Sequence, residues 1–185
     1  MQAITRYSHR QRGRGYTLYE LLISIGIASI VLALGTPSFG ALAARHRLHV
    51  EINALFHAIH VARKESIMRR EVVSICPSAD GRQCLPGRDW SMGWIMFNNR
   101  DRDEPPQVDE DEPVLQVHSV SDAVQLAANR QGFTLRATFL RATNGTIIAC
   151  DRGDRTPARA LVISYTGRPR VTLKNTRGQP YSCAD

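Results

Sequence analysis

The sequence predicts an α+β fold, in which one long N-terminal helix packs on a C-terminal domain rich in antiparallel β-strands. Residues 21–44 carry no charge, residues 41–70 repeat apolar side chains with a helical period, and the remainder alternates short apolar runs with turn residues. The chain shows no strand–helix–strand alternation, so we expect an antiparallel sheet or, preferably, two packed sheets. A composition of 43% hydrophobic and 22% charged residues in a chain of 185 excludes global disorder.

The first element is an uncharged run from Leu21 to Ala44. As a helix it would extend about 36 Å, enough to cross the roughly 30 Å hydrocarbon layer of a membrane. Residues 1–15 before it contain four arginines and no acid, and Arg45 follows it. The run is therefore a membrane segment or a secretion signal, and either one places the C-terminal part outside the cytoplasm.

Two kinds of signal fit this run. An ordinary secretory signal would be cut at the A-x-A site of residues 41–43, but it leaves Glu20 against the apolar core. The stretch Gly-Tyr-Thr-Leu-Tyr-Glu, residues 15–20, resembles the signal of type IV pilins, which a prepilin peptidase cuts after the glycine. The resemblance implies cleavage between Gly15 and Tyr16, N-methylation of Tyr16, and a role in filament assembly for Glu20 and Pro37.

In the pilin family, the acid that matches Glu20 is thought to pair with the N-terminal amine of a neighbouring subunit, and the proline that matches Pro37 kinks the helix. A plain membrane anchor is a third alternative for the same run. On the pilin interpretation the inner membrane holds the protein by a single pass. The expected parts are a leader (1–15), a hydrophobic transmembrane and assembly helix (16–44), an amphipathic helix (45–70) and a periplasmic β-rich globular domain (71–185).

The amphipathic half of the helix should bury one apolar face against a sheet. That face consists of Leu48, Ile52, Leu55, Ile59 and Ala62. Four histidines share this helix, and we favour a solvated polar face over a metal site for them. They are His46, His49, His57 and His60.

After Arg70, eight short runs read as strands, separated by glycine, proline, asparagine and aspartate. The expected strands are 72–76, 93–97, 114–118, 123–128, 132–140, 145–150, 159–165 and 169–174. An acidic segment, residues 100–112, lies between the second and third. It has the carboxylates of a calcium loop, but Pro106 stands where an EF-hand needs glycine, so we expect a solvated acidic loop.

Four cysteines indicate an oxidising compartment and two local disulfides rather than a zinc site, because no Cys-x-x-Cys pair is present. Cys76 and Cys84 bracket a turn-rich insert, whereas Cys150 and Cys183 join the sixth expected strand to the C-terminus. We therefore expect the pairs Cys76–Cys84 and Cys150–Cys183. The other connectivities and four reduced core cysteines are the alternatives.

The run from Val73 to Phe97 narrows the resemblance. Its Val-Ser-Ile-Cys-Pro-Ser-Ala-Asp-Gly start, the second cysteine, Trp90 and the Gly-Trp-Ile-Met-Phe strand look like minor pilins of the FimT kind and the related GspH-like minor pseudopilins of type II secretion. Such a protein is a filament subunit. We accordingly expect no enzyme activity and no cofactor, and the sequence contains no catalytic motif that would argue otherwise.

One basic segment near the C-terminus stands out: Gly167-Arg168-Pro169-Arg170 contains Gly-Arg-x-Arg. In FimT-type pilins involved in DNA uptake such a motif is implicated in DNA binding, so the resemblance assigns Arg168 and Arg170 to that role. Lys174 and Arg177 continue the basic character. Side chains two apart on an extended chain point the same way, about 6–7 Å apart, close to the spacing of successive phosphates. The alternative is a hairpin turn with solvated arginines.

The sequence therefore predicts a minor type IV pilin of the FimT kind that is built into the pilus and binds the DNA phosphate backbone non-specifically for uptake in natural transformation. Its partners would be other pilins of the filament, the prepilin peptidase, the inner membrane and DNA. Two alternatives remain open. One is a GspH-like pseudopilin of the type II secretion system, and the other is a freely secreted binding protein.

Overall fold

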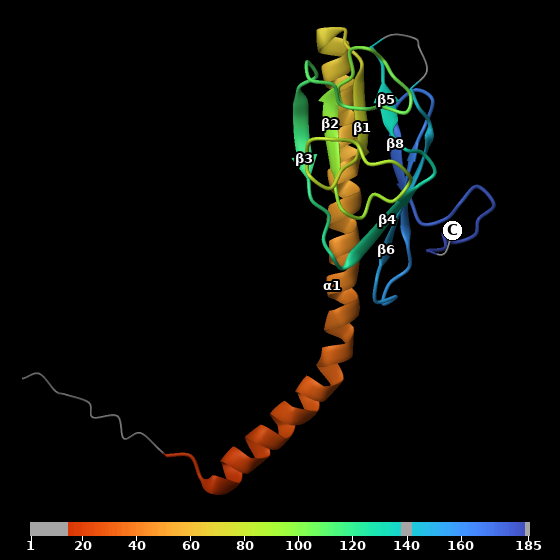
Figure 1. Ribbon diagram of the computed structural model, residues 1–185. Coiled ribbons are helices and arrows are strands. Elements are labelled where there is room, and N and C mark those ends of the chain that lie inside the picture. Colours follow the sequence, from red (N-terminus) through yellow and green to blue (C-terminus); the bar gives the residue numbers. More distant parts are fainter. Residues whose placement is uncertain (1–14, 138–141, 184–185) are drawn as a thin grey trace, which may run out of the picture. The chain divides into compact units, whose positions relative to one another are not determined.

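The computed structural model describes residues 15–137 and 142–183 (Figure 1). One helix, α1, spans Leu18–Arg69 and precedes all the strands. The eight expected strands are all present, which confirms the predicted α+β class. Their bounds are β1 (Val73–Pro77), β2 (Trp94–Asn98), β3 (Val114–His118), β4 (Val124–Ala128), β5 (Phe133–Leu135), β6 (Gly145–Asp151), β7 (Arg159–Ile163) and β8 (Pro169–Thr172).

The strands form two four-stranded sheets in which every pair is antiparallel. The first sheet has the order β3-β2-β1-β5, and the second has the order β4-β6-β7-β8. The two-sheet form of the prediction is thus confirmed. β5 is shorter than the expected 132–140, and residues 138–140 of that range lie outside the described residues.

The chain divides into two compact units, Met1–Phe39 and Gly40–Asp185, and the described helix α1 contributes to both. In the second unit, the predicted apolar face of the helix is fully buried. Leu55, for example, belongs to one core with Ile75 of the first sheet and Ile147 of the second. A helix face with this 3.6-residue period therefore holds both sheets in one hydrophobic core.

In the first unit, α1 begins just after Thr17, whose Oγ1 accepts a hydrogen bond from the backbone N–H of Glu20 (3.3 Å). A threonine followed three residues later by glutamate is the start signal of a capping box. The apolar side chains that follow, such as Leu21 and Ile30, are exposed. α1 runs through Pro37, but the side chains of residues 34–38 lie outside the described residues.

The sequence places a membrane-crossing segment at residues 16–44. Among the described residues, no helix combines the length and the apolar character needed to cross a membrane. The predicted leader, apart from Gly15, lies outside the described residues.

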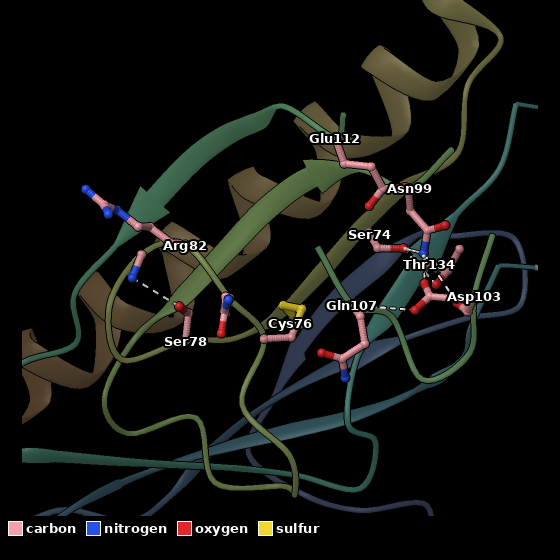
Figure 2. Close-up of a disulfide and its surroundings, with 12 residues drawn as sticks. Ser74, Cys76, Ser78, Arg82, Asn99, Asp103, Gln107, Glu112 and Thr134 are labelled. Atoms are coloured by element: carbon pink, nitrogen blue, oxygen red, sulfur yellow. Dashed lines mark hydrogen bonds between the residues drawn. A yellow bond between two sulfur atoms is a disulfide. The ribbon is translucent and has the colours of Figure 1, made fainter. Parts of the chain in front are cut away.

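Both faces of the first sheet are covered. Ile75 and Met96 face the helix, whereas Cys76 and Phe97 face the opposite side. On that side Cys76 is joined to Cys84 by a disulfide (Figure 2). Val108 of the acidic loop packs against the same cluster. This double coverage explains why β1 and β2 are buried at every position and lack the polar–apolar alternation of a half-exposed strand.

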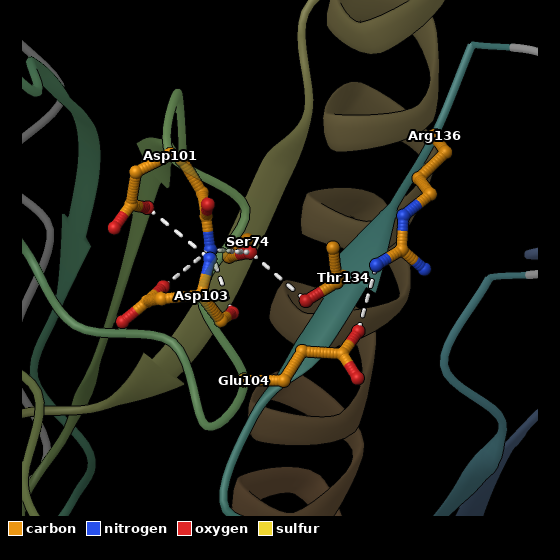
Figure 3. Close-up of polar contacts among 7 residues, drawn as sticks. Ser74, Asp101, Asp103, Glu104, Thr134 and Arg136 are labelled. Atoms are coloured by element: carbon orange, nitrogen blue, oxygen red, sulfur yellow. Dashed lines mark hydrogen bonds and ion pairs between the residues drawn. The ribbon is translucent and has the colours of Figure 1, made fainter.

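A buried polar network ties the acidic loop to the first sheet (Figure 3). The side-chain amide of Asn99 donates to Ser74 Oγ (3.0 Å) and to Asp103 Oδ1 (2.9 Å), and Ser74 Oγ lies 3.0 Å from Thr134 Oγ1. Burial, aided by the charge of Asp101, raises the pKa of Asp103. The loop is thus held by part of its own polar side chains and is not the wholly solvated segment expected from its charge.

Candidate nucleic-acid interface

The Gly-Arg-x-Arg segment forms the turn of the β7–β8 hairpin and the first residues of β8. Ser164 and Arg168 close it, because the N–H of Ser164 donates to the carbonyl of Arg168 (3.1 Å). Gly167 has φ +69°, and its N–H donates to the carbonyl of Ser164 (2.9 Å). A Cβ at Gly167 would lie 2.9 Å from Leu135 Cδ1, so both backbone conformation and space favour glycine here.

β8 carries Arg170 on the outer face of the second sheet, which is the face away from the core. Arg170 pairs with Val162 of β7, while the neighbouring pair, Leu161 and Val171, packs toward the core. Arg168 precedes β8 and lies in the turn, so only Arg170 of the two has a place in the sheet register. Both side chains are exposed.

The C-terminal segment, residues 173–183, turns back over the outer face (Figure 1). Its hairpin loop is held by Asn175, whose Oδ1 accepts the N–H groups of Arg177 (2.9 Å) and Gln179 (3.0 Å). Lys174 and Pro180 form an antiparallel bridge at the base of this loop. The Cys150–Cys183 disulfide then ties the end of the segment to β6, and Cys76–Cys84 is also formed, as the sequence predicts.

A groove of about 600 Å³ lies between the outer face and the C-terminal segment. Val162 and Arg170 contribute from the sheet, and Lys174 and Tyr181 contribute from the segment. No acidic residue is among its described lining residues. They are Thr146, Val162, Arg170, Val171, Thr172, Lys174, Asn175, Thr176 and Tyr181.

The four predicted DNA-binding cations are all exposed, and within residues 15–137 and 142–183 none forms an ion pair. Two other arginines differ from these four, because both lie against the carboxylate of Asp151 at the end of β6. Arg155 makes a bidentate contact with Asp151 (2.9 and 2.8 Å), and Arg47 of α1 lies 4.0 Å from the same carboxylate. The structure thus separates neutralised arginines from cations that are available to an anionic ligand.

The carboxylate of Asp151 should stabilise the fold above about pH 4. Hydrogen bonds from the Arg155 side chain and backbone N–H, with the charges of Arg155 and Arg47, lower the pKa of Asp151 to about 2. A pKa lowered by folding adds stability that is fully present above the unfolded value, 3.8, and is lost as the pH falls toward 2. Replacing Asp151 by asparagine should therefore reduce the free energy of unfolding at pH 7 by about 1.5–3 kcal/mol.

Urea unfolding of both proteins from pH 7 to pH 2 measures this effect. The difference between wild type and Asp151→Asn should shrink below pH 4. Asp154→Asn is the matched control, because Asp154 is exposed and forms no ion pair among the described residues. A difference that stays constant down to pH 2 contradicts the expectation.

The remaining predicted site residues lie in the first unit. Gly15 and Tyr16 precede α1 and are exposed, and Glu20 lies in its first turn. The four histidines of α1 are exposed, and no group of three or more potential metal ligands occurs among the described residues.

Tyr181, which lines the groove, was not singled out from the sequence alone. The signal available for it was its position two residues before Cys183, whose pairing with Cys150 brings it to the outer face.

Comparisons with known proteins agree on the class. The family model described as Type II transport protein GspH matches residues 51–167. The crystal structure of the type IV minor pilin FimU from Pseudomonas aeruginosa is 21% identical and has a TM-score of 0.52, over 75% of this chain and 96% of that one. The minor pseudopilin EpsH from the Type 2 Secretion System of Vibrio cholerae is 10% identical over 68% of this chain and 96% of that one, with a TM-score of 0.48. A search of curated protein sequences found no match.

A long helix packed on two antiparallel sheets, shared with FimU, is the fold of pilin-like filament subunits. Because the family model matches more than half of its length, the chain belongs to the GspH family of minor pilins and pseudopilins. Members of this family are structural subunits that associate with other pilins, which confirms that the protein is not an enzyme.

Proposed function

We propose that this protein is a minor pilin of the FimT kind, which is incorporated into a type IV pilus and binds DNA non-specifically for uptake in natural transformation. The observation that supports the proposal is that four cations close together in the C-terminal sequence are exposed and form no ion pair among the described residues: Arg168, Arg170, Lys174 and Arg177. Unpaired arginines and lysines on one surface are what phosphate-backbone binding requires.

The same proposal includes the route to the filament. Prepilin peptidase would cut between Gly15 and Tyr16, and Tyr16 would be N-methylated. The helix 16–44 would hold the protein in the inner membrane, with residues 71–185 in the periplasm, until assembly. Within the apolar bundle of a filament, Glu20 would pair with the N-terminal amine of a neighbouring subunit, because any other register leaves a buried charge unpaired. Pro37 would bend the helix to fit the filament.

Mass spectrometry of protein from native membranes should find methyl-Tyr16 at the N-terminus. A chain starting at Ala44 would contradict this and favour the freely secreted alternative.

The double substitution Arg168→Gln with Arg170→Gln should weaken DNA binding. Loss of two phosphate contacts should raise the Kd roughly 5- to 150-fold, the equivalent of about 1–3 kcal/mol, and should lower the slope of log K against log salt by up to about two. A gel-shift titration at several salt concentrations measures both quantities. Unchanged binding of this variant would remove Arg168 and Arg170 from the interface.

A matched control removes the same charge elsewhere. Lys64→Gln with Arg82→Gln neutralises two exposed cations, one on α1 and one on the loop beside the Cys76–Cys84 disulfide. Binding should stay within about twofold of wild type, apart from the small effect of net charge. Equal losses of affinity in both double variants would mean that DNA binding depends on the overall charge of the protein and that the hairpin is not the binding site.

The second candidate is a minor pseudopilin of the type II secretion system, which the match to the family of the type II transport protein GspH favours. Such a subunit should show no measurable DNA binding at physiological salt. Deletion of the gene separates the candidates, because a pilin of DNA uptake should reduce transformation and leave exoprotein secretion intact. Deletion of a pseudopilin gene should instead reduce exoprotein secretion and leave transformation intact.

A further inference from the structure

We propose that the groove on the outer face of the second sheet binds single-stranded DNA, with Tyr181 stacking on an unpaired base and Arg170 and Lys174 contacting its phosphates. The inference rests on the proposed DNA-binding function and specifies the ligand and the site. It adds a residue, Tyr181, that the basic motif does not contain, and it distinguishes single-stranded from double-stranded DNA.

Tyr181 is held in place from both sides. The Lys174–Pro180 bridge ends one residue before it, and the Cys150–Cys183 disulfide begins two residues after it. Its side chain is half-buried and lines the groove on one side and a second hollow, next to Asp151, on the other. An aromatic ring fixed by two anchors can stack on a base without losing much conformational entropy.

The groove and the second hollow, which share Tyr181, differ in the charged residues that line them. The groove combines the apolar side chain of Val162 with the cations Arg170 and Lys174, and it contains no acid among its described lining residues. The second hollow is lined by Asp151 and Asp154 together with Arg152, and Asp151 is already paired with Arg155, so its charges largely compensate one another. A polyanion is therefore attracted more strongly to the groove, and this favours that side of Tyr181 for DNA binding.

The mixture of ring, apolar surface and cations fits unpaired nucleotides. A volume of about 600 Å³ is within the range of roughly 300–1,000 Å³ typical of small-ligand sites, so it can accommodate a base. The bases of a duplex are stacked inside the helix, so a duplex offers phosphates to Arg168 and Arg177 but no free ring face to Tyr181. Stacking on an aromatic side chain combined with backbone contacts is how single strands are bound without sequence preference.

Fluorescence anisotropy of the full chain in detergent tests the inference, with a labelled oligo-dT strand and a labelled duplex of equal length. Tyr181→Leu should weaken single-strand binding roughly 5- to 150-fold and leave duplex binding within about twofold. Tyr181→Phe, which keeps the ring, should bind both ligands like wild type. Because no charge is lost, the salt dependence of binding should not change.

Val162→Met is a second variant that leaves Tyr181 in place. Val162 lies on the outer face and lines the groove, so a longer side chain without an aromatic ring should partly fill it and should also lower single-strand binding selectively. Unchanged single-strand binding in both variants, or equal losses for strand and duplex, would overturn the inference while the phosphate contacts of Arg168 and Arg170 stand. If the wild type binds neither ligand, the proposed function itself fails, and the inference fails with it.

Discussion

Replacing Gly93 by alanine should destabilise the protein by about 2–6 kcal/mol. Gly93 precedes β2 with φ +144°, a conformation that residues with a side chain rarely adopt. A Cβ there would lie 2.6 Å from the carbonyl oxygen of His118 and 3.1 Å from that of Ser78. Both atoms are backbone, at the ends of β3 and β1, so the clash cannot be relieved by a side-chain rotation and must displace two strands.

Gly87→Ala is the matched control for this prediction. Gly87 also has a positive φ, +103°, but a Cβ there would meet no atom within 4 Å. Only the conformational penalty, about 1–3 kcal/mol, should remain. Chemical denaturation of both variants measures the difference. A Gly93 variant no less stable than the Gly87 variant would show that the first sheet can shift to make room.

Removing the Cys150–Cys183 disulfide should reduce the free energy of unfolding by about 3–4 kcal/mol, according to the chain-entropy estimate for a 33-residue separation. The same estimate gives only about 2.5 kcal/mol for Cys76–Cys84, whose separation is 8. The larger effect is expected for the longer loop, because the unfolded chain gains more freedom when a long loop opens. The double variant Cys150→Ala with Cys183→Ala isolates this bond.

The variant Cys76→Ala with Cys84→Ala is the control, and urea unfolding of the two double variants compares them. The first variant should also lose single-strand DNA affinity, because Tyr181 is then anchored on one side only, whereas the control should keep it. The opposite order of stabilities would mean that packing of Cys76 against Phe97 outweighs loop length.

Local patterns in the sequence predicted much of this fold. The buried face of α1 follows from a helical period, the eight strands follow from short apolar runs between turn residues, and each disulfide joins a strand to a nearby turn or terminus. The helix face and the strands depend on neighbours within a few residues of one another, and the disulfide pairs follow from the positions of only four cysteines, so a single sequence contains the information. The Gly167 turn of the Gly-Arg-x-Arg segment belongs to the same group.

What the sequence could not provide depends on contacts between distant segments. The pairing of β1 with β5 joins residues about sixty positions apart, and the polar network of Ser74, Asn99 and Thr134 depends on that pairing. The charge of the acidic loop indicated solvation, whereas in the structure the hydrogen bonds that Asp103 accepts from Asn99 and Gln107 help to fix the loop. The groove also could not be predicted from the sequence, because it forms only when the Cys150–Cys183 disulfide holds the C-terminal segment against the second sheet.

The interior of the described chain begins at Ala44, since every buried hydrophobic side chain comes from that residue or a later one. The described side chains of the helix before Gly40 take no part in it. Cooperative unfolding of the two sheets is therefore expected to depend on the second unit. The exposed side chains that precede the second unit can therefore be adapted to their surroundings by evolution. Such changes do not reduce the free energy of folding of the sheets.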